Sequence, residues 1–239
     1  MNEKIAYFDN AATTFPKTEC VYEFMNEFYR NCGGNAGRGN HGFAMTSGKL
    51  ISETRTLIKE LLHCQTKEVI FTPSATFALN MIIQGIICSG AKNIYISPFE
   101  HNAVTRVLHH FEKQNMIVIH QLNFEKFDFN FERIKYQFEE IKPDLVICTH
   151  ASNVTGIILP VAELCNLSKS FGATTVIDMA QTCGLVDLDC GNQNIDFAVF
   201  AGHKTLYGPT GIGGFVMNQN IALPPVIFGG TGVDSINQE

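Results

Sequence analysis

The stretch LVICTHASNVTGIILPVAELCNLSKSFGATTVID, residues 145–178, decides the fold. It begins with an apolar run over 145–149, which is typical of a buried strand. A segment with helical spacing follows over 161–171, opening after a proline and ending at a glycine, and a second β-branched run occupies 174–177. Strand, helix and strand in this order predict two parallel strands joined by a right-handed crossover.

The same alternation continues on both sides of this stretch. Further strand-like runs lie at 69–71, 93–96, 117–120, 197–200 and 213–217, with helical segments at 77–87, 104–111 and 134–141. Two helices are expected before the sheet: one follows Pro16 and stops at Gly33 and Gly34 by positive φ, and the next extends to Leu62. We therefore expect an α/β fold with three layers, in which helices flank a mostly parallel sheet.

Composition excludes several classes of protein. With 239 residues, 45% hydrophobic and 17% charged, the chain can bury a real core. The net charge of −6 and the scattered basic residues argue against nucleic-acid binding. No apolar run is long enough for a signal peptide or a membrane span, so we expect no membrane association. The eight cysteines contain no C-x-x-C pair, which favours reduced thiols in a cytoplasmic protein and no metal site.

Polar residues follow five of the expected strands. They occupy 72–76, 99–102, 150–153, 178–181 and 202–204. In open parallel sheets the ligand binds outside the carboxyl ends of the strands. These five segments are therefore expected to meet at one site.

The residues in these segments match what a pyridoxal phosphate (PLP) enzyme requires. Lys204 is the candidate for the Schiff base, and Asp178 is the candidate carboxylate for the pyridine nitrogen. His101 can lie on the ring face and move protons near neutral pH. Each residue also has an ordinary structural explanation, such as a turn cap or a solvated lysine. Their occurrence at successive strand ends favours the shared chemical role.

The phosphate and the ring oxygen also have candidate partners. Ser74, Ala75 and Thr76 precede an apolar helix, whose N-terminal N–H groups and dipole favour an anion. An N-cap alone would explain the same three residues. Gln181 and Asn153 can hydrogen-bond the ring hydroxyl oxygen.

Six motifs resemble those of the class V aminotransferases, and most closely the cysteine desulfurase-like branch. They are YFDNAATTFPK (7–17), GNAGRGNHG (34–42), PFEHNAV (98–104), HASNVTG (150–156), VIDMAQTCG (176–184) and AGHKTLYGPTGIGG (201–214). The resemblance implies a fold-type I PLP enzyme, usually a homodimer.

The resemblance also implies a role for each matching residue. It places the Schiff base on Lys204, pairs Asp178 with the pyridine nitrogen and stacks His101 on the ring. The remaining implied contacts are Gln181 and Asn153 to the ring oxygen and substrate, Thr76 and His203 to the phosphate, and the backbone of 9–13 to the substrate side. Ala201 departs from the pattern, because many relatives carry a Ser or Thr phosphate ligand there. Thr231 and Ser235 are expected near the phosphate of a neighbouring subunit.

The resemblance further implies a division of the chain into two parts. Residues 1–20 would be associated with the small domain, and 21–239 would form the PLP-binding large domain. The C-terminal part of the family pattern is expected to be missing from these 239 residues. That part carries the arginine for the substrate carboxylate and the persulfide-forming cysteine.

The expected function is PLP-dependent cysteine desulfuration, from L-cysteine to L-alanine with the sulfur held as an enzyme persulfide. A sulfur-acceptor protein would then be a partner. Two alternatives stay open at this point. One is a selenocysteine lyase or another class V aminotransferase, and the other is a non-catalytic protein that binds PLP or a partner.

Overall fold

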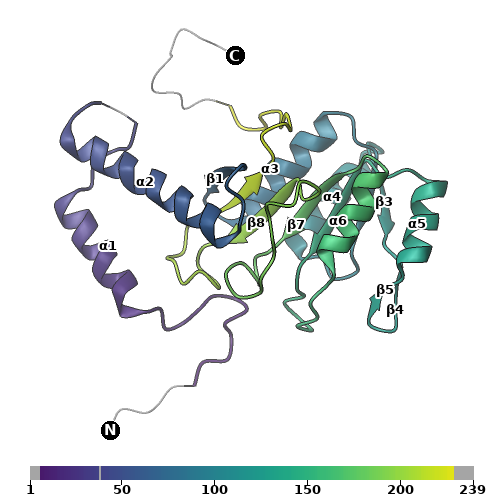
Figure 1. The fold of residues 1–239 in the computed structure, drawn as a ribbon, viewed down its shortest axis with the longest axis horizontal. Helices are drawn as coiled ribbons and strands as arrows, with labels where there is room; N and C mark the ends of the chain where they lie inside the picture. Colours follow the sequence, from purple (N-terminus) through teal and green to yellow (C-terminus); the bar gives the residue numbers. More distant parts are fainter. Residues whose placement is uncertain (1–5, 38, 229–239) are drawn as a thin grey trace.

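A seven-stranded sheet forms the centre of the protein (Figure 1). The computed structural model describes residues 6–37 and 39–228. The strands are ordered β1-β9-β8-β7-β6-β2-β3. Their bounds are β1 Glu68–Thr72, β2 Asn93–Ile96, β3 Val118–Gln121, β6 Leu145–Thr149, β7 Thr174–Asp178, β8 Phe197–Ala201 and β9 Gly213–Met217. The pairs from β3 to β8 are parallel, whereas β9 runs antiparallel to both β8 and β1, so the expectation of a mostly parallel sheet is confirmed.

Helices cover both faces of this sheet. The helices α3 (Ala75–Cys88) and α4 (Asn102–Lys113) pack on one face. The end of α2 (Gly42–Leu61) packs on the other face with α5 (Phe131–Glu140) and α6 (Val161–Ser170). Because helices cover both of its sides, β6 is buried at every position, which explains its uninterrupted apolar sequence. The three-layer α/β architecture is confirmed.

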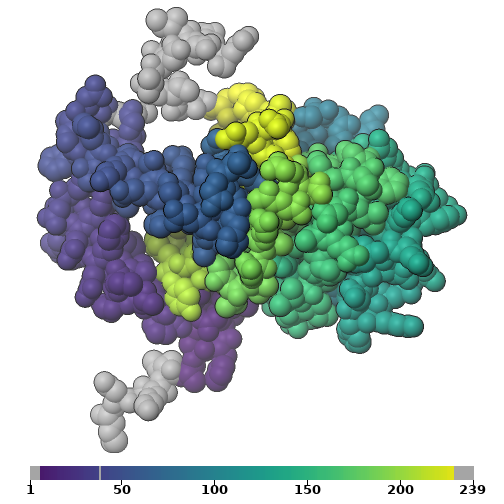
Figure 2. All heavy atoms as spheres, in the orientation of Figure 1, coloured from purple at the N-terminus to yellow at the C-terminus, as the bar shows by residue number. Residues whose placement is uncertain are grey.

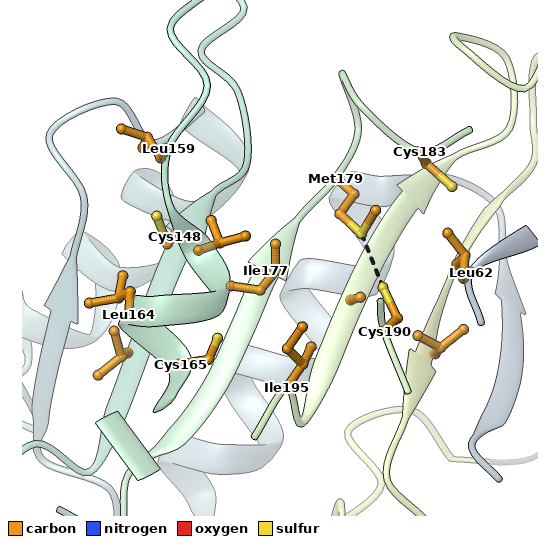
Figure 3. Packing of buried hydrophobic residues seen from close by; sticks show 14 of the residues in the cluster. Leu62, Cys148, Leu159, Leu164, Cys165, Ile177, Met179, Cys183, Cys190 and Ile195 are labelled. Carbon is orange, nitrogen blue, oxygen red and sulfur yellow. Dashed lines mark hydrogen bonds between the residues drawn. The ribbon is translucent and has the colours of Figure 1, made fainter. Parts of the chain in front are cut away.

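One half of the core is rich in sulfur (Figure 3). Cys148, Cys165, Cys183 and Cys190 are all buried there, and the Cys190 thiol donates to Met179 Sδ at 3.6 Å. Burial raises the pKa of the Cys183 and Cys190 thiols to about 12. Thiols of this kind stay protonated at neutral pH and are poor nucleophiles. These cysteines therefore pack the core.

A small hairpin was not expected from the sequence. It pairs β4 (Phe124–Glu125) with β5 (Asp128–Phe129) through Lys126 and Phe127, whose φ values are 53° and 66°. Two successive residues with positive φ are characteristic of a type I′ hairpin turn. Strands of two residues carry too little alternation to be recognised in a sequence.

The end of α1 (Glu19–Asn31) also differs from the expectation. Its C-cap is Cys32, with φ −154°, and Gly33 and Gly34 do not adopt positive φ, so that expectation is wrong. Gly34 serves close packing instead, since a Cβ there would lie 2.7 Å from the backbone of Phe43. No residue of α1 is buried, and its apolar face lies outside both core clusters.

Candidate functional site

A cavity of about 460 Å³ opens at the carboxyl ends of β6, β7 and β8. This volume lies within the range of small-molecule sites, roughly 300–1,000 Å³. All nine residues that the sequence predicted for the site line it: Ser74, Ala75, Thr76, His101, Asn153, Asp178, Gln181, His203 and Lys204. Asp9, Ala11 and Ala12 of the N-terminal segment complete one wall. The strand-end rule therefore brings the predicted residues together, while their chemical roles stay predictions.

Lys204 and Asp178 both line the cavity, and each influences the pKa of the other. Burial lowers the pKa of the Lys204 amine, and the nearby Asp178 partly offsets this effect. Burial raises the pKa of Asp178. A hydrogen bond from Ala180 N to Oδ1, at 2.9 Å, and the charges of Lys204 and His101 lower this pKa and offset part of the effect. A lowered amine pKa increases the neutral, nucleophilic fraction of Lys204. The Asp178 carboxyl retains acceptor capacity for a cationic group in the cavity.

The N-terminus of α3 forms another part of the cavity wall. Ser74 is its N-cap, and its Oγ accepts a hydrogen bond from Phe77 N at 3.1 Å. The first N–H groups of a helix have no intrahelical partner, and Ala75 and Thr76 present this part of the helix to the cavity. Gly213 of β9 lies directly against it, because a Cβ at this position would come within 2.7 Å of Ala75 N and Ser74 C. The end of α3 that lines the cavity is thus fixed by backbone-to-backbone packing.

Replacing Gly213 with alanine is expected to lower the free energy of unfolding by about 2 kcal/mol. The added methyl group meets backbone atoms, which cannot rotate away as a side chain can. Gly48→Ala is the matched control, since Gly48 lies within α2 and a Cβ added there would meet nothing within 4 Å, and it should raise stability by about 0.5–1 kcal/mol. Urea denaturation of both variants measures the difference. Equal stability of the two variants would contradict the packing argument.

His101 is the N-cap of α4 and lies on the cavity wall. Its Nδ1 accepts a hydrogen bond from Ala103 N at 3.1 Å. In the neutral ring the proton is therefore on Nε2. The helix cap fixes one edge of the imidazole and leaves the other nitrogen available as a donor.

The N-terminal segment is fastened to the backbone around Lys204. Thr14 Oγ1 donates to Lys204 O at 2.8 Å, and Thr13 Oγ1 donates to His203 O at 3.1 Å. The Lys17 amine also donates to His203 O, at 3.1 Å. Figure 2 shows this purple segment against the yellow-green part of the chain that follows β8. The sequence did not predict these contacts, because side-chain bonds to a distant backbone leave no periodic signal.

These bonds also determine the tautomer of His203. The Thr13 hydroxyl proton is used for His203 O, so His203 Nδ1 must donate in its 3.0 Å contact with Thr13 Oγ1. Burial lowers the pKa of His203, and the positive charges of Lys204 and Lys17 lower it further. The neutral ring then carries no proton on Nε2. His203 can donate from Nε2 only when an anion nearby makes the charged ring favourable.

The same segment also contacts Gln181, another residue of the cavity wall. Gln181 Nε2 donates to Ala11 O at 2.9 Å. Residues 11–17 are thus tied to the sheet's ligand-binding edge, and the division into 1–20 and 21–239 stays a prediction. Thr231 and Ser235 lie outside the described residues.

The described ranges, 6–37 and 39–228, contain neither a metal cluster nor a membrane span. No three His, Cys, Asp or Glu side chains within them are grouped closely enough to hold a metal ion. None of the helices in this part of the chain has the length and apolarity that crossing a bilayer requires.

Comparison with known proteins places this chain in a family. The model of the family "Aminotransferase class-V" matches residues 6–239. A probable cysteine desulfurase of Pyrococcus abyssi is 30% identical over 97% of this chain and 58% of its own length. Cysteine desulfurase IscS of Dictyoglomus turgidum is 29% identical over 94% of this chain and 57% of its own length. The chain thus spans less than two thirds of these relatives.

Solved structures give the same result. The apo structure of a cysteine desulfurase from Thermococcus onnurineus superposes with a TM-score of 0.83, at 26% identity, over 90% of this chain and 54% of the other. A structure described as SspA in complex with cysteine has a TM-score of 0.85 at 26% identity, over 95% of this chain and 65% of the other. Together with the family model, these similarities show that the chain belongs to the class V aminotransferases, a family of PLP-dependent enzymes.

Proposed function

We propose that this protein is a PLP-dependent cysteine desulfurase, or the cofactor-binding part of one, acting on L-cysteine. The observation that carries the proposal is one cavity in which Lys204, Asp178 and the N-terminus of α3 face the same space. The names of the relatives support the choice of cysteine as substrate over other amino acids.

The residues of the cavity fit the cofactor. PLP supplies an aldehyde that binds an amine covalently and a cationic ring that withdraws electrons from a bound amino acid. Lys204 provides an amine with a lowered pKa, and Asp178 provides a buried carboxyl that lacks a full set of partners. The cost of burying that carboxyl falls once a cationic nitrogen lies beside it. His101, Gln181 and Asn153 line the remaining wall.

The phosphate would lie at the N-terminus of α3. Ala75 and Thr76 contribute backbone N–H groups there, and the helix dipole adds favourable charge. His203 would gain a proton as the anion arrives, because the anion raises the pKa that burial and the two lysines lower. Ala201 has no hydroxyl, so the phosphate would receive fewer side-chain hydrogen bonds in this site.

The chain's own residues then orient the substrate and move protons. Lys204 would hold or return a proton at Nζ, and His101 would donate one from Nε2. The sulfur must pass to a thiol, yet no cysteine of the described chain lines the cavity. We propose that the accepting thiol comes from another part of the protein or from a second molecule.

The test uses the purified protein reconstituted with PLP. Borohydride reduction followed by peptide mapping should place the pyridoxyl group on Lys204. With L-cysteine and excess dithiothreitol as the sulfur acceptor, equal amounts of alanine and sulfide are expected. Formation of a keto acid without sulfide would favour an aminotransferase. Cofactor binding with no turnover would favour a binding protein.

Homodimer formation and a cytoplasmic location are part of the same proposal. The uncovered apolar side chains of α1 and α2 support a subunit interface, among them Phe24, Tyr29, Phe43 and Met45. All eight cysteines lie in the described chain and are unpaired, which supports a reducing compartment. Light scattering after gel filtration measures the mass of the assembly.

A further inference from the structure

A half-buried glutamate beside the cavity has no role in the mechanism proposed above. Glu100 directly precedes His101 in the turn between β2 and α4. Its Oε1 accepts hydrogen bonds from Thr149 N, at 2.7 Å, and from the Ser97 hydroxyl. Its Oε2 is buried without any hydrogen-bond partner in the described part of the protein. Such orphan oxygens are rare and require a physical explanation.

The two bonds of Oε1 connect the His101 turn to the sheet. Ser97 lies at the end of β2, and its hydroxyl also accepts from Phe99 N at 3.3 Å, which shapes the turn. Thr149 is the last residue of β6. Glu100 thus fastens the segment that carries His101 to the neighbouring strand end, and loss of its carboxyl would free that segment.

Glu100 also lies close to the carboxyl that the cofactor ring needs. Thr149, which binds Glu100, pairs in register with Asp178 of β7. The groups that contact or influence Glu100 are Ser97 on its own turn, Cys148 and Thr149 on β6, and Asp178 on β7, and His101 follows it directly in the chain. Apart from the exposed His101, none of these residues can carry a positive charge. Two ionised carboxylates at this place would repel each other.

The charge state of Glu100 follows from this setting. Burial raises its pKa to about 7, and the charge of Asp178 raises it too, while the bonds from Ser97 and Thr149 act in the opposite direction. An ionised carboxylate with a wholly unpartnered buried oxygen is costly, and a proton on Oε2 removes most of that cost.

We propose that Glu100 is a positioning residue of the cofactor site, whose carboxyl holds the His101 turn against β6 and, in its protonated form, leaves the negative charge to Asp178. The part of the proposal that concerns the cofactor rests on the proposed function. The part that concerns the proton does not.

The first measurement uses the protein without cofactor. Infrared difference spectra between the wild type and Glu100→Gln at pH 6 should show the carbonyl stretch of a protonated acid in the wild type. A proton held more tightly in the folded state stabilises that state at low pH, and this contribution is lost as pH rises from about 4.5 to about 7. The melting temperature of the wild type relative to Glu100→Gln should therefore fall over this range. Glu139→Gln, on the exposed face of α5, is the control and should show no such trend.

The second measurement compares PLP binding. Glu100→Gln keeps an uncharged side chain with an acceptor oxygen, so it should bind PLP like the wild type, with the same visible circular dichroism. Glu100→Met keeps the size but loses the acceptor, and should bind about tenfold more weakly with an altered spectrum. Wild-type PLP binding in Glu100→Gln together with weaker binding in Glu100→Met would show that the acceptor oxygen matters, because both replacements fill a similar space.

Each outcome decides part of the proposal. Absence of the protonated-acid band, or a melting difference independent of pH, overturns the assigned charge state. Equal PLP spectra for Glu100→Met and the wild type overturn the positioning role. If Glu100→Met does not fold, the same comparison is made with Glu100→Asp, whose shorter carboxyl should also weaken PLP binding. If no PLP attaches to Lys204 in any variant while the band is present, the proposed function fails and the protonated Glu100 stands.

Discussion

Lys204→Ala should abolish covalent attachment of PLP completely. The cavity is lined by one lysine amine within the described chain, and burial has already lowered its pKa, so this group is the nucleophile available to the aldehyde. The variant should show no visible absorbance of bound cofactor after gel filtration and no pyridoxyl peptide after borohydride. Turnover of L-cysteine should fall to the background rate of free PLP. Absorbance spectroscopy and peptide mapping measure these effects.

Two matched variants separate the amine from its charge and from its neighbours. Lys204→Arg keeps a positive charge near Asp178 but cannot attach the aldehyde, so it should lose the covalent cofactor as completely as the alanine variant. Lys17→Met removes a nearby amine that is occupied by the carbonyl oxygens of Thr14 and His203, both at 3.1 Å, and should retain the pyridoxyl peptide. A labelled peptide that contains Lys17 instead of Lys204 would overturn the assignment.

Asp178→Asn should change the free and the cofactor-bound protein in opposite directions. Without cofactor, burial raises the pKa of Asp178, so the folded state holds its proton more tightly than the unfolded chain does. The free energy of unfolding therefore falls as pH rises from the unfolded pKa of this carboxyl to its higher folded pKa. The asparagine variant does not titrate and does not show this loss. The amide oxygen can still accept from Ala180 N. At pH 7.5 the variant should melt at a higher temperature than the wild type.

With cofactor the sign reverses. A buried cationic ring nitrogen without its partner costs about 3–5 kcal/mol, so PLP affinity should fall by about 100- to 4,000-fold. Calorimetric titration of the protein with PLP measures the loss. Asp187→Asn is the control, because that carboxyl is exposed and only contacts His63 at 3.4 Å, and it should change neither quantity measurably. Wild-type affinity in Asp178→Asn would remove the carboxyl from the site.

The sheet and most helices were predictable from the sequence because their signal is local. Strands such as 145–149 and 213–217 are buried on both sides and appear as short apolar runs, and the polar residues after the strands gather by topology alone. The pairing of β1 with β9 was not predictable, since neighbouring strands leave no mark on each other's sequence. The apolar stripe of α1 was visible, but periodicity cannot say what covers it.

Fine details of the site were beyond sequence reasoning for a different reason. The tautomer of His203 depends on which atom accepts the hydrogen bond from the Thr13 hydroxyl. The charge state of Glu100 depends on Asp178 of β7, which lies two strands away from β2 in the sheet. Both are properties of contacts between segments far apart in the chain. The PFEHNAV motif contained Glu100, yet nothing in the motif distinguishes an acid that caps a turn from one that stays protonated.

The position of β9 has a consequence for how the protein is made. A ribosome releases β1 early, but the strand that joins β1 to the rest of the sheet is the last one in the described chain. Before β9 is made, β1 can pack only on segments close to it in the chain. Such late, long-range strand pairing slows folding and leaves an unpaired strand edge exposed. Gly213, at the start of that strand, also packs against the N-terminus of α3, where we propose that the phosphate binds, so the nascent chain should acquire affinity for the vitamin-derived cofactor only after β9 has left the ribosome.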